Sequence, residues 1–141
     1  MEWFLLATLS ALFAALVSIL AKIGLQGVDS TVATSLRAIV MMLFTVVFVI
    51  STGKGPQLTQ FSSKHIGFII LSGVAGALSW LCYFAALELA DASKVAPVDR
   101  ASVLIVMVLA ALFLGERITL KTAVAGVFVF VGLLLFAVKL E

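Results

Sequence analysis

Charged side chains are scarce in this chain of 141 residues. Nine Lys and Arg and seven Asp and Glu make up 11% of the sequence, whereas a soluble domain carries about 25% charged residues. Hydrophobic residues make up 64%, and the mean hydropathy is +1.31. A domain this small leaves much of its chain exposed, so it has no room to bury so many apolar side chains. The composition excludes a water-soluble globular protein and predicts an integral membrane protein.

Residue patterns typical of disulfides, metal sites, nucleic-acid binding and catalysis are also sparse or absent. The single cysteine, Cys82, excludes an internal disulfide and a cysteine-based metal cluster, and we expect it to be a small core residue. The net charge of +2 comes from scattered Lys and Arg, which is not typical of nucleic-acid binding. No Ser/His/Asp set, metal-ligand spacing or glycine-rich phosphate loop occurs. We therefore expect no enzymatic activity, no metal site and no cofactor.

Long apolar runs dominate the sequence. A helix needs about 20 apolar residues to cross a bilayer, and five runs approach this length. They leave room only for short turns, such as the Gly- and Pro-containing segment 51–57. Asp29 or Ser30 and Thr119 are the expected N-caps of two of these helices. The predicted fold is all-α, a membrane bundle in one domain over residues 1–141. Its five spans cover about 3–21, 31–50, 66–87, 92–114 and 120–138.

Positive charges are balanced between the two sides of the membrane. With five spans, four Lys and Arg lie on the side of the N-terminus and three on the other, or five if two arginines inside the spans are counted. An excess of Lys and Arg on the cytoplasmic side normally sets orientation. Two interpretations stay open: a single orientation with a weak bias, or dual topology with copies pairing as an antiparallel homodimer. The Lys and Arg on the side of the N-terminus are Lys54, Lys64, Arg117 and Lys121, and those on the other side are Lys22, Lys94 and Lys139.

Three charged residues lie about two turns inside predicted spans: Arg37, Asp99 and Arg100. Such a residue costs at least about 2.5–3.5 kcal/mol on insertion scales, so it faces protein or water and often marks a transport pathway. A structural ion pair inside the membrane is an equally good explanation, both for Arg37 and for the neighbours Asp99 and Arg100. For Lys22 and Lys94, at span ends, snorkelling to the interface is the favoured interpretation.

Pro97 allows two starts for the fourth span. In one, the helix begins at Pro97 after an irregular segment 92–96, which places Asp99 in the first turn, where the helix dipole favours a negative charge. Irregular backbone at this depth borders transporter sites in many proteins. In the other, an ordinary kinked helix begins near Ser93.

Trp80 and Tyr83 lie deeper in the third span than the aromatic belt at a membrane interface. They suit the wall of a cavity for an organic substrate, or a wedge between helices. In the first span, Ser10, Ala14 and Ser18 form a stripe of small residues, for which close helix packing is the default explanation.

Four short segments of the sequence, by their order and spacing, resemble the EamA domain of the drug/metabolite transporter superfamily. The fifth span, with Gly126 and Gly132, also resembles the family pattern. The match covers essentially the whole chain. The four segments are Ala21-Lys-Ile-Gly-Leu25, Ala33-Thr-Ser-Leu-Arg37, Ala92-Ser-Lys-Val-Ala-Pro-Val98 and Leu112-Phe-Leu-Gly-Glu-Arg117.

The resemblance implies a five-helix unit that larger members carry twice, in inverted orientation, as ten-helix transporters. It implies transport of metabolites or drugs, commonly outward, and a need for this chain to pair, most simply with an inverted copy of itself. The related small multidrug-resistance proteins exchange protons through a membrane-embedded glutamate in their first span. Here the only acid near that span is Glu2, at its start, so that mechanism is not carried over.

These observations lead to one main hypothesis and one alternative. The main hypothesis is a transporter of the bacterial inner membrane that holds a small-molecule substrate near the bilayer midplane. Its binding residues are Arg37, Trp80, Tyr83, Asp99 and Arg100, with Lys22 as a possible accessory residue. The alternative is a non-transporting scaffold or accessory subunit, in which the same charges only pair helices.

Overall fold

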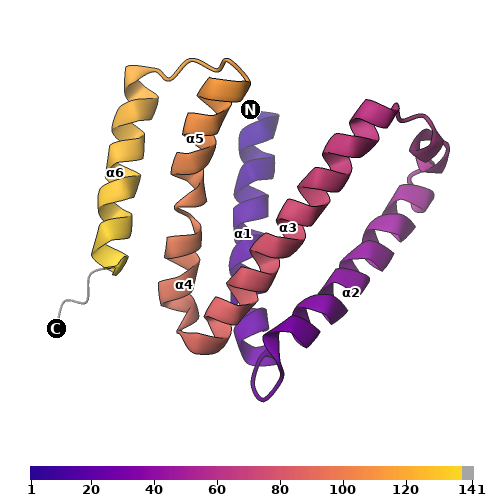
Figure 1. The fold of residues 1–141 in the computed structure, drawn as a ribbon, viewed down its shortest axis with the longest axis horizontal. Coiled ribbons are helices and arrows are strands. Elements are labelled where there is room, and N and C mark those ends of the chain that lie inside the picture. Colours follow the sequence, from indigo (N-terminus) through magenta and orange to yellow (C-terminus); the bar gives the residue numbers. More distant parts are fainter. Residues whose placement is uncertain (138–141) are drawn as a thin grey trace. The chain divides into compact units, whose positions relative to one another are not determined.

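The computed structural model describes residues 1–137, and every regular element in that range is a helix. Figure 1 shows the helices following one another through short turns. A break divides the predicted fourth span into two helices, α4 and α5. The elements are α1 (Glu2–Gly24), α2 (Ser30–Ser51), the 3-10 helix η1 (Gly55–Thr59), α3 (Ser63–Leu89), α4 (Ala92–Asp99), α5 (Ser102–Phe113) and α6 (Leu120–Ala137).

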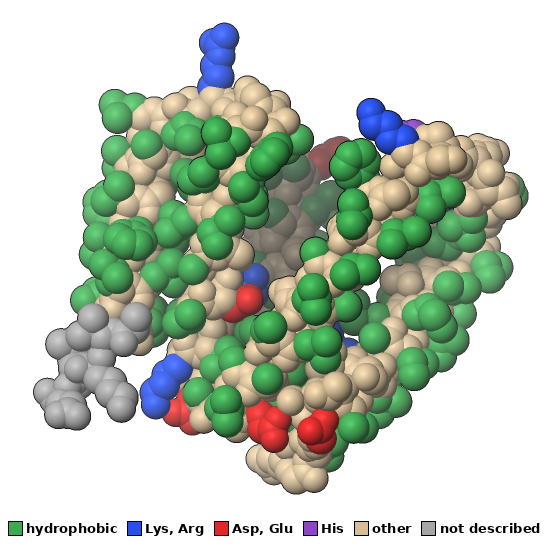
Figure 2. Space-filling model, in the orientation of Figure 1, with side chains coloured by type: hydrophobic (Ala, Val, Ile, Leu, Met, Phe, Trp, Pro, Cys, Tyr) green, Lys and Arg blue, Asp and Glu red, His purple; other side chains and the backbone are tan. Residues whose placement is uncertain are grey.

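Four of the five predicted spans are long and apolar enough to cross a membrane. They are α1, α2, α3 and the stretch Ala92–Phe113 that contains α4 and α5. Helix α6 is equally apolar but shorter, with 18 residues, and the predicted end of its span at Val138 lies outside the described residues. Apolar side chains cover the visible flanks of the helices, as Figure 2 shows. The all-helical membrane fold is confirmed, while the crossing by the fifth helix stays a prediction.

Local capping fixes where the helices begin. The Asp29 carboxylate accepts hydrogen bonds from the backbone N–H groups of Thr31 and Val32, at 2.9 and 3.0 Å. The Thr119 hydroxyl accepts one from the N–H of Thr122 at 3.2 Å. Each satisfies N–H groups that have no partner within the first turn of the helix. Both predicted N-caps are therefore confirmed.

The fourth span begins before Pro97, so the predicted irregular segment 92–96 is wrong. Asp91 has extended backbone at the N-cap position, and its carboxylate pairs with Lys94 at 2.9 Å. Pro97 lies inside α4 and offers no N–H to the carbonyl of Ser93. The α-helical pattern ends three residues later, where Arg100 and Ala101 donate to the carbonyls three residues back at 3.0 and 2.9 Å. The predicted kinked helix near Ser93 is closer to what is observed.

Contacts divide the chain into two units, Met1–Leu89 and the part from Ala90 onward. In the first unit α3 packs against both α1 and α2, and its few buried apolar residues include Tyr83, Phe84 and Leu87. In the second unit α6 packs against α4 and α5. Each unit leaves most of its large apolar side chains exposed, which is the surface that lipid or another helix covers.

Candidate functional site

Arg37 and Trp80 form the centre of the candidate site in the first unit. Arg37 lies seven residues after the start of α2, about two turns into the span. Its guanidinium carbon lies over the Trp80 ring of α3, 3.5 Å from the ring centroid, and 5.5 Å from that of Phe84. A guanidinium over an aromatic face is stabilised by the ring quadrupole, most strongly by tryptophan. The charge inside the span is therefore held by aromatic rings.

Trp80 is itself fixed by a cluster of rings on α3. Its ring lies edge-on to Tyr83 and Phe84, with centroid distances of 5.6 and 5.9 Å. Trp80 and Phe84 are four residues apart, so they lie on one face of the helix. Tyr83 and Phe84 are 8% and 3% exposed. Because Tyr83 and Phe84 are buried, the Trp80 ring, over which Arg37 lies, has a defined orientation.

Two polar contacts connect α1 to α3. The hydroxyls of Ser18 and Tyr83 share a hydrogen bond of 2.6 Å, and Ser18 also donates to the Ala14 carbonyl at 3.0 Å. One turn along both helices, the Lys22 ammonium donates to the carbonyl of Leu87 at 2.5 Å. Lys22 therefore also stabilises the C-terminal end of α3, where helix carbonyls lack partners.

An apolar cavity of about 510 Å³ within the first unit has Arg37 among the residues that line it. Helices α1 and α2 supply most of its wall, and α3 contributes Phe84. Trp80 and Tyr83 are not among the residues that line it; Trp80 supports Arg37, and Tyr83 is bonded to Ser18. The lining includes Val17, Leu20, Val32, Leu36, Arg37 and Phe84.

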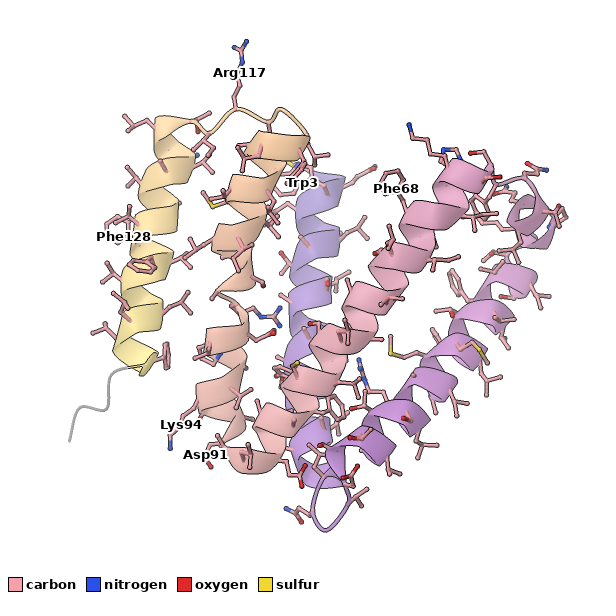
Figure 3. The ribbon with its side chains drawn as sticks, in the orientation of Figure 1. Trp3, Phe68, Asp91, Lys94, Arg117 and Phe128 are labelled. Atoms are coloured by element: carbon pink, nitrogen blue, oxygen red, sulfur yellow. The ribbon has the colours of Figure 1, made fainter. Side chains whose placement is uncertain are left out.

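Asp99 and Arg100 lie in the second unit, at the break between α4 and α5. Asp99 is the last residue of α4, so the predicted position in a first helical turn is wrong. Both side chains are exposed, and within residues 1–137 neither makes a hydrogen bond or an ion pair. The ion pair that does form lies at the start of α4 and joins Asp91, its N-cap, to Lys94; Figure 3 labels both residues.

Two members of the cluster, Phe84 and Ser18, were not assigned to the site from the sequence, and one residue, Cys82, was misplaced. Phe84 was recognisable from its spacing of four after Trp80, and Ser18 from its spacing of four before Lys22. The bond from Ser18 to Tyr83 joins residues 65 positions apart, which no local pattern reveals. Cys82 is exposed on α3, so its predicted place in the core is wrong.

Comparison with known proteins agrees with this architecture. The model of the EamA-like transporter family matches residues 1–138. A Sinorhizobium protein described as an uncharacterized transporter in the cobO 3' region is 39% identical over 137 residues, which is 97% of each chain. No solved structure matches the chain. A family match over nearly the whole chain, with a transporter-named relative of the same extent, shows that this protein belongs to the EamA-like transporter family of membrane proteins.

Proposed function

We propose that the chain is one half of a ten-helix transporter that moves a small metabolite or drug-like compound across the bacterial inner membrane, outward, by alternating access. Family membership supports transport as the function class. The match to the Sinorhizobium relative leaves almost none of that protein uncovered, so the relative is also about one five-helix unit long. Two such units complete the assembly that we propose.

The proposed partner is a second, inverted copy of the same chain. Four Lys and Arg on one side against three on the other give little reason to prefer one orientation. Copies inserted both ways supply the two inverted halves that such a transporter needs. The proposed complex is an antiparallel homodimer in the lipid bilayer.

The observation that carries the proposal is Arg37, a cation two turns inside a span and beside a cavity. Placing a charge there is costly, and its usual reason is contact with a substrate or ion. We assign to Arg37, and separately to Arg100, the role of binding an anionic group of the substrate. Asp99 positions Arg100 or binds an amine. Trp80 holds Arg37 beside the cavity, and Tyr83 packs against the Trp80 ring. Lys22 has an accessory role at the end of α1.

Transport by purified protein in liposomes tests the function and the site together. Vesicles are loaded with a labelled panel of amino acids, carboxylates and amines, and efflux is compared for wild type, Arg37→Gln, Asp99→Asn and Arg100→Gln. We expect efflux of at least one compound by wild type, and its loss in the variants while the dimer remains intact. Thr45→Val is the control, because Thr45 is exposed on α2 and bonds only to carbonyls of its own helix.

Two results contradict this proposal in different ways. Full efflux by all three charge variants removes the site assignment but leaves transport. No efflux by wild type, together with loss of the dimer in the variants, favours the alternative, a membrane scaffold whose charges hold helices together.

A further inference from the structure

The cavity of the first unit contains a single charge. Of the residues that line it, only Arg37 is ionisable, and the remaining lining side chains are apolar. The acids of this unit, Glu2, Asp29 and Glu88, lie at helix ends and are not part of the wall. The volume of about 510 Å³ lies within the range of about 300–1,000 Å³ that is usual for ligand pockets.

The contact with Trp80 leaves the hydrogen-bonding edge of Arg37 available. Stacking uses the face of the guanidinium, while its five N–H donors lie in its plane. Within residues 1–137 none of these donors takes part in a hydrogen bond or an ion pair. An arginine with free donors, in a cavity whose other lining side chains are apolar, matches a carboxylate, which accepts two parallel N–H bonds from arginine.

We infer that the substrate is an organic monoanion, a small carboxylate with an apolar body. The inference rests on the proposed function, whose substrate it narrows. The carboxylate binds the edge of Arg37, and the hydrocarbon body fills the cavity between α1 and α2. An amine meets a like charge with no carboxylate in the wall, and a dianion or zwitterion leaves one charge without a partner in an apolar site.

Binding to Trp80 can be measured by its fluorescence, because the chain has only two tryptophans. In a Trp3→Phe background in nanodiscs, Trp80 is the only one left. The probes share one ring and differ in charge: phenylacetate, 2-phenylethanol, 2-phenylethylamine and phenylalanine. We expect phenylacetate to bind at least about tenfold more tightly than the other three, since a charge-assisted hydrogen bond contributes about this factor or more.

Variants test whether Arg37 is the anchor. Arg37→Gln is expected to weaken phenylacetate binding at least about tenfold and to leave binding of 2-phenylethanol unchanged. Lys54→Gln removes a positive charge from the exposed loop before η1 and is expected to bind as wild type does. Size-exclusion profiles that coincide with wild type identify the variants that are folded.

Three results overturn the inference. They are equal or tighter binding of the amine or the alcohol, unchanged phenylacetate binding in folded Arg37→Gln, and loss of phenylacetate binding when phosphatidylglycerol is added to the nanodiscs. The last outcome assigns Arg37 to an anionic lipid headgroup in place of a soluble carboxylate.

Flux measurements separate this inference from the function on which it rests. Proteoliposomes that release phenylalanine or the amine, but do not bind phenylacetate, leave transport standing and overturn the monoanion. Binding of phenylacetate that depends on Arg37, without efflux of any probe or panel compound, supports the site chemistry and overturns transport.

Discussion

At the residue scale, the chain holds a cation inside the membrane with aromatic rings. A carboxylate partner neutralises an arginine and occupies its donors, whereas Trp80 stabilises the charge and leaves the N–H edge exposed. Lysine is not equivalent at this position, because its ammonium is a compact point charge without a planar face. The arrangement stabilises Arg37 and keeps it available to a ligand.

The hydrogen bond between Ser18 and Tyr83 is expected to stabilise the packing of α1 against α3. Ser18→Ala, Tyr83→Phe and the double variant form a cycle whose coupling free energy should be about 0.6 kcal/mol and at most about 1.7 kcal/mol, the range for bonds between membrane helices. Unfolding in mixed detergent micelles measures how far the free energy of unfolding of each of the three variants differs from that of wild type. Ser35→Ala is the control, because Ser35 is exposed and bonds only to the Thr31 carbonyl of its own helix. A coupling of zero would mean that the bond contributes nothing to stability.

Residues whose role is local were predictable from the sequence, and residues paired over a distance were not. Asp29 and Thr119 were assigned as caps because a cap acts within three residues of itself. Arg37 and Trp80 were each identified as unusual inside a span. Their contact was not predicted, because it joins two different helices. Spacing gives the face of each helix and not its partner, so the site was predicted as separate residues.

At the scale of the elements, packing in the second unit depends on a close approach between α5 and α6. Gly126 of α6 is buried, and a Cβ placed on it would lie 3.2 Å from the terminal methyl of Met107. Small residues allow membrane helices to approach in this way. The break before α5 was harder to predict. One interpretation began the helix at Pro97 and the other placed a kink there, whereas the interruption follows Pro97 by three residues.

A leucine at Gly126 is expected to weaken the contact of α6 with α5. The added side chain must displace Met107, and overpacking of this kind costs about 1–3 kcal/mol of the free energy of unfolding. Thermal unfolding of Gly126→Leu in detergent measures the loss. Gly132→Leu is the matched control on the same helix, since no atom lies within 4 Å of the Cβ added there. Equal destabilisation by both substitutions would contradict close packing at Gly126.

At the scale of the whole molecule, the composition was sufficient to predict a helical membrane protein, and four predicted spans are long, apolar helices. The fully buried part of the chain is small: Leu87 is the one large side chain of residues 1–137 with no exposed surface. In the proposed dimer, a second copy would cover some of the apolar faces that one chain leaves exposed. Charge balance is compatible with the pairing that we propose, and contacts within one chain do not reveal it.

The antiparallel dimer predicts that activity is lost when every copy inserts the same way. Thr52→Lys, Gln57→Lys and Gln60→Lys, all exposed, raise the positive charge of the 51–64 side from four to seven against three. Reporter fusions at each terminus should give signal on both sides of the membrane for wild type and on one side for this variant, with loss of efflux.

Uncharged substitutions at the same positions, Thr52→Gln, Gln57→Asn and Gln60→Asn, should keep both orientations and full efflux. Co-expression with a copy biased the other way, five against two, by Gln26→Lys, Leu89→Lys, Lys54→Gln and Lys64→Gln should restore transport, because inverted halves are again present. Full efflux from a variant found in a single orientation would mean that two parallel copies, or one copy alone, carry out transport.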